Sequence, residues 1–201
     1  MASTTLRELT GQPSEPSALN DSALIMIDCQ NTYCEGVMKL DGAEKALEEA
    51  RRLLEAARAA KCPIFHIQHD AGPGTPYDVS APIGKIAAIV APHAEEPVLT
   101  KNVPSSFTGT DLHERLQKLE CKELILAGFM THMCVSSTAR AAFELGYRCT
   151  VVGGATATRA LPAAGTGDSD VVDAKTLKAS SLAEVADMFA VVVDTIDDLK
   201  K

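Results

Sequence analysis

Residues 123–149, ELILAGFMTHMCVSSTARAAFELGYRC, contain the pattern that decides the fold of this chain. A short apolar run at residues 123–127 reads as a strand, and residues 132–145 have the composition of a helix. Gly146 follows the last helical residue, as is typical of a helix C-terminus. Residues 148–152 form a second apolar run. A strand, a helix and a second strand in this order predict a unit of parallel β-structure with a crossover helix.

The same alternation continues on both sides of this stretch. Further strands are predicted at residues 23–27, 64–68, 97–100 and 190–193, and further helices at 43–60, 110–119 and 181–188. Strands that alternate with helices predict an α/β fold, here a three-layer α/β/α arrangement around a six-stranded, mainly parallel sheet. The length of 201 residues suits one domain over residues 1–201, with 1–22 as a polar lead-in segment. Loops at 30–39, 69–92 and 155–170 are expected to form the pocket.

Composition narrows the classes of partner. The net charge is −8 and no basic stripe occurs, which argues against nucleic acid or an anionic membrane as the main partner. No run approaches the ~20 apolar residues of a membrane span. The six cysteines are Cys29, Cys34, Cys62, Cys121, Cys134 and Cys149, and they form no CxxC pair. The N-terminus has no apolar signal core. We therefore expect reduced thiols and a cytoplasmic location.

Three reactive side chains stand at or just after predicted strand ends. Asp28 ends the first strand, Lys101 ends the third, and Cys134 follows the fourth. In a parallel sheet the ligand crevice lies beyond the carboxyl ends of the strands, so these residues are expected to converge on one edge.

Together the three side chains suit acyl transfer. Cys134 is predicted in the first turn of its helix with Thr131 as N-cap, where the helix start and Lys101 favour a thiolate. Asp28 could accept the thiol proton. The alternative is structural: Cys134 fills the core, Asp28 is a cap and Lys101 is solvated.

Three stretches resemble the isochorismatase-like cysteine hydrolase superfamily. They are IDCQNTYCEG around Asp28, LTKNVPSSFTGTDLHERL around Lys101, and LAGFMTHMCVSSTARAAFELGYRCTVV around Cys134. The third contains the specific pattern G-x-x-T-x-x-C-V, formed by Gly128, Thr131, Cys134 and Val135. The similarity covers nearly the whole chain from Ala23 onward.

The resemblance implies a catalytic triad of Asp28, Lys101 and Cys134. It also implies a cis peptide between Phe129 and Met130, with the amides of Met130 and Cys134 as the oxyanion hole. Isochorismatases proper hydrolyse a vinyl ether and need no cysteine nucleophile. A cysteine at position 134 therefore favours hydrolysis of the C–N bond of a small amide, ureido or carbamoyl substrate through a thioester. Vinyl ether hydrolysis, and a non-catalytic binding or assembly protein on the same fold, are the alternatives.

The sequence identifies the residues that contact the substrate less well than it identifies the triad. Phe107 follows the lysine strand and is a candidate for substrate contact or for a core aromatic, and Gln30 and Tyr33 are further candidates. Relatives usually carry an acidic residue where this chain has Gly153-Gly154, and often a histidine where it has Lys178. Because of these departures, the resemblance does not identify the substrate of this chain.

No cofactor or metal is expected. His66 and His69 are three residues apart on a strand, which directs them to opposite faces. The Asp-x-His metal pattern of nicotinamidase relatives is missing after the second strand, where the chain reads His69-Asp70-Ala71-Gly72. Family members usually assemble, so we also predict a homo-oligomer.

Overall fold

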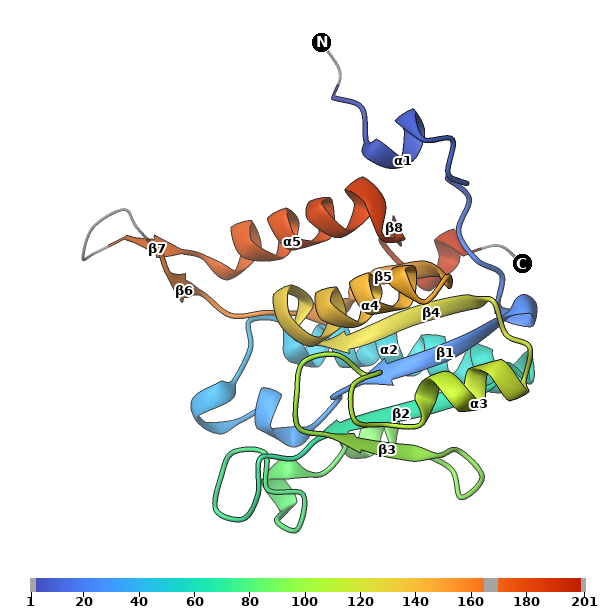
Figure 1. The fold of residues 1–201 in the computed structure, drawn as a ribbon. Helices are drawn as coiled ribbons and strands as arrows, with labels where there is room; N and C mark the ends of the chain where they lie inside the picture. The colour runs from blue at the N-terminus through green and yellow to red at the C-terminus, as the bar shows by residue number, and fades with distance from the viewer. Residues whose placement is uncertain (1–2, 165–169, 200–201) are drawn as a thin grey trace.

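A computed structural model describes residues 3–164 and 170–199 of the chain (Figure 1). Its main sheet has six strands in the order β3-β2-β1-β4-β5-β8, and every neighbouring pair is parallel. The strands of this sheet are β1 (Ser22–Ile27), β2 (Ile64–His69), β3 (Val98–Lys101), β4 (Glu123–Phe129), β5 (Arg148–Ala157) and β8 (Val191–Val193). The predicted α/β class and six-stranded sheet are confirmed.

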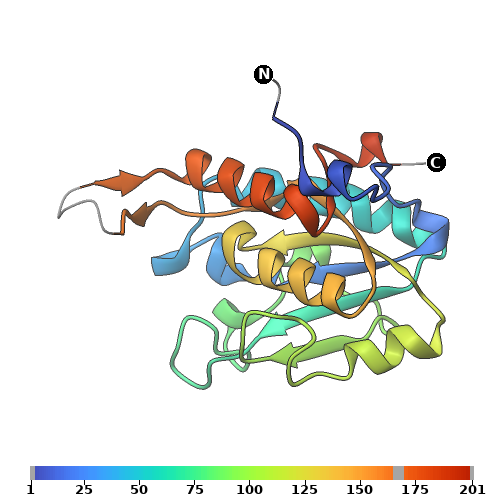
Figure 2. The same ribbon diagram turned by 45° about the horizontal axis from the view of Figure 1, so that its top comes forward.

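The helices cover both faces of the sheet. They are α1 (Leu6–Leu9), α2 (Ala43–Ala59), α3 (Leu112–Lys118), α4 (Ser136–Glu144) and α5 (Ala174–Met188). Short 3₁₀ turns lie at Leu19–Asp21, Asn31–Tyr33, Gly36–Met38, Pro82–Gly84, Ala88–Val90 and Ile196–Asp198. Residues of α2 join one apolar core, whereas residues of α3, α4 and α5 join the other. The three predicted layers are therefore present (Figure 2).

Strand β1 separates the two cores. All six of its residues are buried. Leu24 and Met26 belong to the core beside α2, whereas Ala23, Ile25 and Ile27 belong to the core beside α3 and α4. Successive side chains of a strand point to opposite faces, so a strand with a helix layer on each side needs apolar residues throughout. This requirement explains the continuous apolar run ahead of Asp28.

The region after residue 152 differs from the prediction. Strand β5 continues to Ala157 instead of ending at Val152, because Gly153 and Gly154 interrupt its apolar pattern without interrupting its backbone. Part of the predicted 155–170 loop is thus strand, and a short antiparallel pair, β6 (Leu161–Pro162) and β7 (Val171–Val172), follows. Residues 165–169 of that loop lie outside the described part of the chain. In both views β6 and β7 extend beyond the body of the molecule (Figures 1 and 2).

Helix α5 begins at Ala174, seven residues earlier than predicted. Asp173 is its N-cap, and the carboxylate accepts a hydrogen bond of 2.9 Å from the backbone N–H of Thr176. The sequence therefore contained an N-cap signal that the apolar pattern did not reveal.

The lead-in segment is packed and is not a free tail. Arg7 of α1 is buried and its guanidinium donates to the carbonyl oxygens of Met188 and Pro13. The N–H of Leu6 donates to Asp187 over 2.9 Å, and the N–H of Ser17 donates to the Thr150 hydroxyl over 2.8 Å. These bonds attach the segment to the C-terminal end of α5 and to the sheet.

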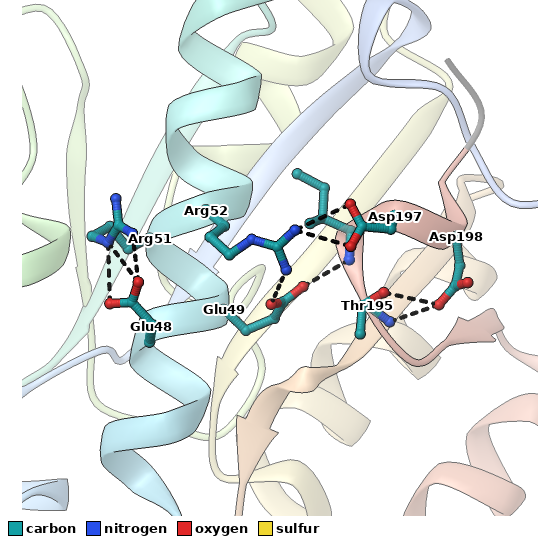
Figure 3. A network of polar contacts seen from close by, with 8 residues as sticks. Glu48, Glu49, Arg51, Arg52, Thr195, Asp197 and Asp198 are labelled. Carbon is teal, nitrogen blue, oxygen red and sulfur yellow. Dashed lines mark hydrogen bonds and ion pairs between the residues drawn. The ribbon is translucent and has the colours of Figure 1, made fainter.

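Ionic contacts attach α2 to the last turn of the chain (Figure 3). Arg52 contacts Glu49 over 2.7 Å and Asp197 over 2.9 Å. Glu49 also accepts the N–H of Ile196 over 2.8 Å. Exposed ion pairs of this kind contribute little free energy, so their main effect is to fix the position of the C-terminal turn. In residues 3–164 and 170–199, no helix has the length and apolar character needed to cross a membrane.

Candidate active site

The structure brings Asp28, Lys101 and Cys134 together at the carboxyl edge of the sheet. The Lys101 Nζ lies 2.5 Å from Oδ2 of Asp28 and 3.4 Å from Sγ of Cys134. The side chains of Asp28 and Lys101 are fully enclosed, and Cys134 is 5% exposed. A buried ion pair beside a thiol does not fit the alternative in which Lys101 is solvated.

Strand order explains how Lys101 reaches Asp28. Strand β2 lies between β1 and β3, and the last residue of β2, His69, is in register with Lys101. The Lys101 side chain passes this end of β2 to reach Asp28, and its Nζ lies 3.3 Å from Nδ1 of His69. His69 is thus a neighbour of the site that sequence reasoning considered only as a metal ligand.

The backbone of Asp28 is held in an uncommon conformation. Its φ is 49°, in the left-handed region that few residues other than glycine adopt. The N–H of Asp28 donates to the Ile67 carbonyl over 3.0 Å, which attaches it to β2. Such a conformation persists where the surrounding structure imposes it, and it turns the chain out of β1 directly after the strand.

The cysteine's turn is a π-helix over Thr131–Val135, and the α-helix α4 begins only at Ser136. The carbonyl oxygen of Met130 accepts the N–H groups of Met133 and Val135 over 3.0 and 3.2 Å. The peptide between Phe129 and Met130 is cis. Single π turns inside helices are frequent at functional sites.

The predicted N-cap is wrong. Met130 occupies the cap position of the turn, and no side chain makes a capping hydrogen bond. Thr131 is the first residue inside the turn, and its buried hydroxyl has no hydrogen-bond partner among the described residues. Five residues in π conformation separate Met130 from the start of α4 at Ser136, so the cap rules for an α-helix do not apply at Thr131.

Burial controls the protonation of the site. It raises the pKa of Asp28 to about 6, because desolvation of the carboxylate outweighs the opposing charge of Lys101. Burial also raises the pKa of the Cys134 thiol to about 12, reinforced by the negative charge of Asp28 and opposed by Lys101. Burial and the charge of Asp28 therefore oppose the thiolate form of Cys134, whereas Lys101 favours it.

The position of Asp28 suits it to receive that proton. Oδ2 of its carboxylate bonds Lys101, whereas Oδ1 is buried and has no partner within usual hydrogen-bond distances among residues 3–164 and 170–199. The carboxylate and the thiol are nevertheless close enough to shift each other's pKa. Burial raises the pKa of the thiol as well as that of the carboxyl group, so it is the closeness of the two groups that suits Asp28 to receive the proton.

The side chain of Gln30 makes its hydrogen bonds with backbone groups. It is fully buried, and its amide nitrogen donates to the carbonyl oxygens of His69 and Gly84 over 3.0 and 2.5 Å. Its amide oxygen accepts the N–H of His69 over 2.9 Å. These bonds connect the end of β1 to the end of β2 and to the following loop. The arrangement favours a positioning role over the expected contact with substrate.

Tyr33 lies in an aromatic cluster beside the triad. It is 1% exposed, and its ring meets Phe129 and Tyr77 edge-on at centroid distances of 5.4 and 5.9 Å. Burial, followed by the negative charge of Asp28, raises the pKa of Tyr33. Tyr77 also meets the ring of His69 at 4.9 Å. Tyr77 was not singled out from the sequence, because it lies in a Gly/Pro-rich loop far from the triad in the chain.

Phe107 is stacked on Tyr147, with ring centroids 5.8 Å apart. Tyr147 directly precedes β5 and also contacts His113 of α3. Phe107 packs against the apolar core on the α3 and α4 side of the sheet. These contacts favour the core-aromatic alternative for Phe107.

His132, in the cysteine's turn, contacts the segment that follows β5. Nδ1 of His132 lies 2.5 Å from the hydroxyl of Thr158, the residue that follows β5. Burial, followed by the charge of Arg159, lowers the pKa of His132. Arg159 comes next in the chain. The sequence placed His132 at the start of a predicted helix, and Thr158 and Arg159 in the predicted 155–170 loop.

The two strand histidines have different partners. His66 is 1% exposed, and its Nε2 lies 2.9 Å from Glu96, whereas His69 faces Lys101. The described residues include no group of three or more His, Cys, Asp or Glu side chains suited to a metal ion. Metal-independent activity stays a prediction.

The positions that depart from the family pattern line a hollow of about 550 Å³. Its walls include Gly153, Gly154, Lys178 and Asp194, and none of the triad residues. Lys178 donates to the carbonyl oxygen of Thr156 over 2.7 Å. The departures thus lie along β5 and α5.

Comparison with known proteins supplies the family. The isochorismatase domain model matches residues 22–197. A crystal structure of an isochorismatase from Pseudomonas putida is 38% identical and superimposes with a TM-score of 0.93, covering 99% of this chain and 100% of that one.

Two curated relatives extend the comparison. A secreted isochorismatase effector of Verticillium dahliae is 35% identical over 192 residues, which are 95% of this chain and 97% of that protein. A ureidoacrylate amidohydrolase of Variovorax paradoxus is 30% identical over 171 residues, 66% of this chain and 68% of that protein. The chain belongs to the isochorismatase family and is an isochorismatase-like hydrolase.

Proposed function

We propose that this hydrolase cleaves the C–N bond of a small amide, ureido or carbamoyl substrate through a thioester on Cys134. The observation that carries the proposal is the enclosed contact of Lys101 with both Asp28 and Cys134, at 2.5 and 3.4 Å. A nucleophile, a base and a fixed positive charge within reach of one another are the parts that covalent acyl transfer needs. A matched relative named as an amidohydrolase gives further support.

The first half-reaction begins with proton transfer. Asp28 accepts the thiol proton of Cys134, and the thiolate attacks the carbonyl carbon of the substrate. The backbone N–H groups of Met130 and Cys134 stabilise the oxyanion, an interaction usually worth about 3 kcal/mol per donor. Asp28 then returns the proton to the leaving nitrogen, the C–N bond breaks, and an amine or ammonia departs.

The second half-reaction restores the enzyme. Asp28 removes a proton from water, whose oxygen attacks the thioester carbonyl carbon. The C–S bond breaks, the acid leaves, and the proton returns to the thiolate. Lys101 remains charged throughout, which stabilises the thiolate and holds Asp28 in place.

The buried thiol favours this chemistry over the alternatives. Hydrolysis of a vinyl ether needs protonation of carbon or oxygen and no thiol. A binding or assembly protein needs neither a buried ion pair nor a carboxyl group with a raised pKa, and both are costly to maintain.

The test is a screen of small primary amides, ureides and N-carbamoyl compounds with wild type and Cys134→Ala, measuring released amine or ammonia. We expect wild type to turn over at least one compound and Cys134→Ala to lose about a thousandfold or more of the rate. Acid quenching followed by peptide mass spectrometry should find the acyl group on Cys134. Cys34→Ala is the matched control, since Cys34 is a half-buried thiol of the Asp28 motif.

Two results would contradict the proposal. An acyl adduct on another cysteine would remove Cys134 from its role. Hydrolysis of isochorismate at equal rates by wild type and Cys134→Ala, with no amide turned over, would favour ether hydrolysis.

A further inference from the structure

A second pocket lies at the end of the sheet away from the triad. It has a volume of about 320 Å³ and is lined by Arg148 and Cys149 at the start of β5, whereas the triad lies at the carboxyl edge of the sheet. Phe143 of α4 and Phe189, directly after α5, add further walls, and Arg7 adds one from the lead-in segment. Segments far apart in the chain thus enclose a space that the proposed reaction does not use.

Two arginine side chains line this pocket. Arg7 is 7% exposed, and its guanidinium donates to the neutral carbonyl oxygens of Met188 and Pro13. Arg148 pairs with Glu123 over 2.7 Å through one nitrogen, whereas its Nε is buried and has no hydrogen-bond partner in the described part of the chain. Burial lowers the pKa of Arg7, and the nearby charge of Arg148 lowers it further. Buried donors are nearly always paired, so an orphaned Nε beside a second arginine indicates that a ligand supplies the missing acceptor.

The rest of the wall is largely aromatic. Phe143 and Phe189 meet edge-on with ring centroids 5.6 Å apart, and Tyr147, which also lines the pocket, is 6% exposed. Ligand pockets in proteins combine apolar walls with a few placed polar groups, and their volumes begin at about 300 Å³. A pocket of this size and lining admits one apolar ring together with one small charged group.

We propose that this pocket binds a small organic oxyanion, a carboxylate or phosphate attached to an apolar ring, with its charged group between Arg7 and Arg148. Guanidinium groups bind the oxygens of carboxylates and phosphates through paired N–H···O bonds, and such charge-assisted bonds are strong. The ring lies against Phe143 and Phe189. The bound anion connects the lead-in segment to the start of β5 and so holds that segment in place. The site is separate from the triad, so the inference does not depend on the proposed reaction.

Isothermal titration calorimetry with three small probes tests the site. Benzoate and phenyl phosphate carry a charged group on a ring, and benzamide is the neutral counterpart of benzoate. The titrated protein is the full chain with Cys134→Ala, which cannot turn over a probe through the proposed thioester. We expect benzoate or phenyl phosphate to bind at least about tenfold more tightly than benzamide, and the tighter of the two identifies the charged group. Equal binding of all three probes, or binding of none, would overturn the inference.

Arg148→Gln, added to this protein, decides where the anion binds. Arg7 also holds the lead-in segment through its backbone bonds, so Arg7→Gln serves as the second variant. We expect each to weaken binding of the tighter anion about tenfold, with circular dichroism verifying that the protein is folded. Arg51→Gln is the matched control, since Arg51 is an ion-paired arginine of α2 whose side chain is 33% exposed, against 30% for Arg148. Weakening of less than about twofold in Arg148→Gln, or equal weakening in Arg51→Gln, would overturn the inference.

Hydrogen exchange measured by mass spectrometry gives a second readout. Backbone N–H groups of the lead-in segment are hydrogen-bonded within it, among them that of Gln12 to the carbonyl oxygen of Arg7 over 2.9 Å. A saturating anion should slow exchange at residues 6–12, because it connects this segment to β5, and should leave exchange in α2 unchanged. In Arg148→Gln the slowing should disappear. Equal slowing in α2, or none at residues 6–12 while calorimetry shows binding, would place the anion elsewhere and overturn the inference.

Discussion

Gly128 lies so close to Ile27 that a Cβ atom on it would stand 1.9 Å from the carbonyl oxygen of Ile27. These two residues are partners in the β1–β4 ladder; Ile27 directly precedes Asp28, and Gly128 lies near the end of β4, ahead of the turn that holds Cys134. The φ of Gly128 is 120°, a backbone angle that residues with a side chain rarely adopt. This contact fixes the separation between the end of β1, which Asp28 follows, and the end of β4, which the turn with Cys134 follows.

Gly128→Ala is therefore expected to destabilise the fold by more than about 3 kcal/mol, or to separate the two strand ends. Urea denaturation measures the first effect, and the rate of Cys134 alkylation in the folded protein measures the second. Gly109→Ala is the matched control, since Gly109 has a positive φ of 75° and open space around it. It should cost only about 1 kcal/mol. Equal behaviour of the two variants would show that the close contact does not constrain the site.

The reactivity of Cys134 should depend on pH through Asp28. Below about pH 6 the Asp28 carboxyl is protonated and cannot accept the thiol proton, so alkylation by iodoacetamide should rise with pH through about 6 and then level off. In Asp28→Asn this step should disappear, and the rate should rise only towards the high pKa of the thiol. A step near pH 6 that persists in Asp28→Asn would assign it to another group.

The raised pKa of Asp28 also makes a prediction for stability. The folded protein holds this proton more tightly than the unfolded chain, since burial raises the pKa of Asp28 to about 6 from its ordinary value of 3.8. The contribution of Asp28 to the free energy of unfolding should therefore fall as pH rises from about 4 to about 6. Urea titrations at several pH values, in wild type and in Asp28→Asn, measure how the free energy of unfolding changes with pH, and that slope gives the number of protons released on unfolding. An equal slope in both proteins would contradict the prediction.

Glu96 should act with the opposite sign. Hydrogen bonds from Arg58 are the main cause that lowers the pKa of Glu96 to about 2, and the N–H of His93 and the ring of His66 add to it. The stability that Glu96 contributes is present above about pH 4.5 and is lost as pH falls towards 2. Glu96→Gln should cost about 2 kcal/mol at pH 7, and the cost should shrink in acid. Glu95, its exposed neighbour, provides the control: Glu95→Gln should change the free energy of unfolding neither at pH 7 nor in acid.

Gln30 is predicted to position the site. Gln30→Ala leaves the carbonyl oxygens of His69 and Gly84 and the N–H of His69 without their partner, which should cost about 2–3 kcal/mol. It should also slow alkylation of Cys134, because the end of β2 supports Lys101. Asn31→Ala removes an exposed bond of 2.8 Å to the same loop and should cost well under half as much. A stable Gln30→Ala variant with weakened substrate binding alone would instead support direct contact.

A homo-oligomer remains our prediction for the state in solution. The β6–β7 pair extends from the body of the molecule, and Val171 within it is 66% exposed (Figure 1). Sedimentation at micromolar concentrations should give a dimer or a larger assembly, and a monomer would contradict the prediction. Val171→Asp should lower the mass if this pair takes part, whereas Leu119→Asp, at a 51% exposed position near α3, should not.

Local pattern predicted the α/β class and the three candidate residues, and the family resemblance then implied that they form a triad. Asp28 follows β1, Lys101 ends β3 and Cys134 lies in the turn after β4, and parallel strands place such ends at one edge of the sheet. Neither inference needs contacts between distant residues, which is why Asp28, Lys101 and Cys134 could be named in advance.

Tertiary structure alone decided the burial and the surroundings of these three residues. Burial depends on what packs over a group, so no pattern near Cys134 indicates that the pKa of its thiol and the pKa of Asp28 are raised. The π turn, the backbone bonds of Gln30 and the nearness of Tyr77 and Arg159 to the site likewise arise from segments far apart in the chain. Sequence spacing determines where strands end, whereas desolvation and the choice of neighbours are set only when those ends meet.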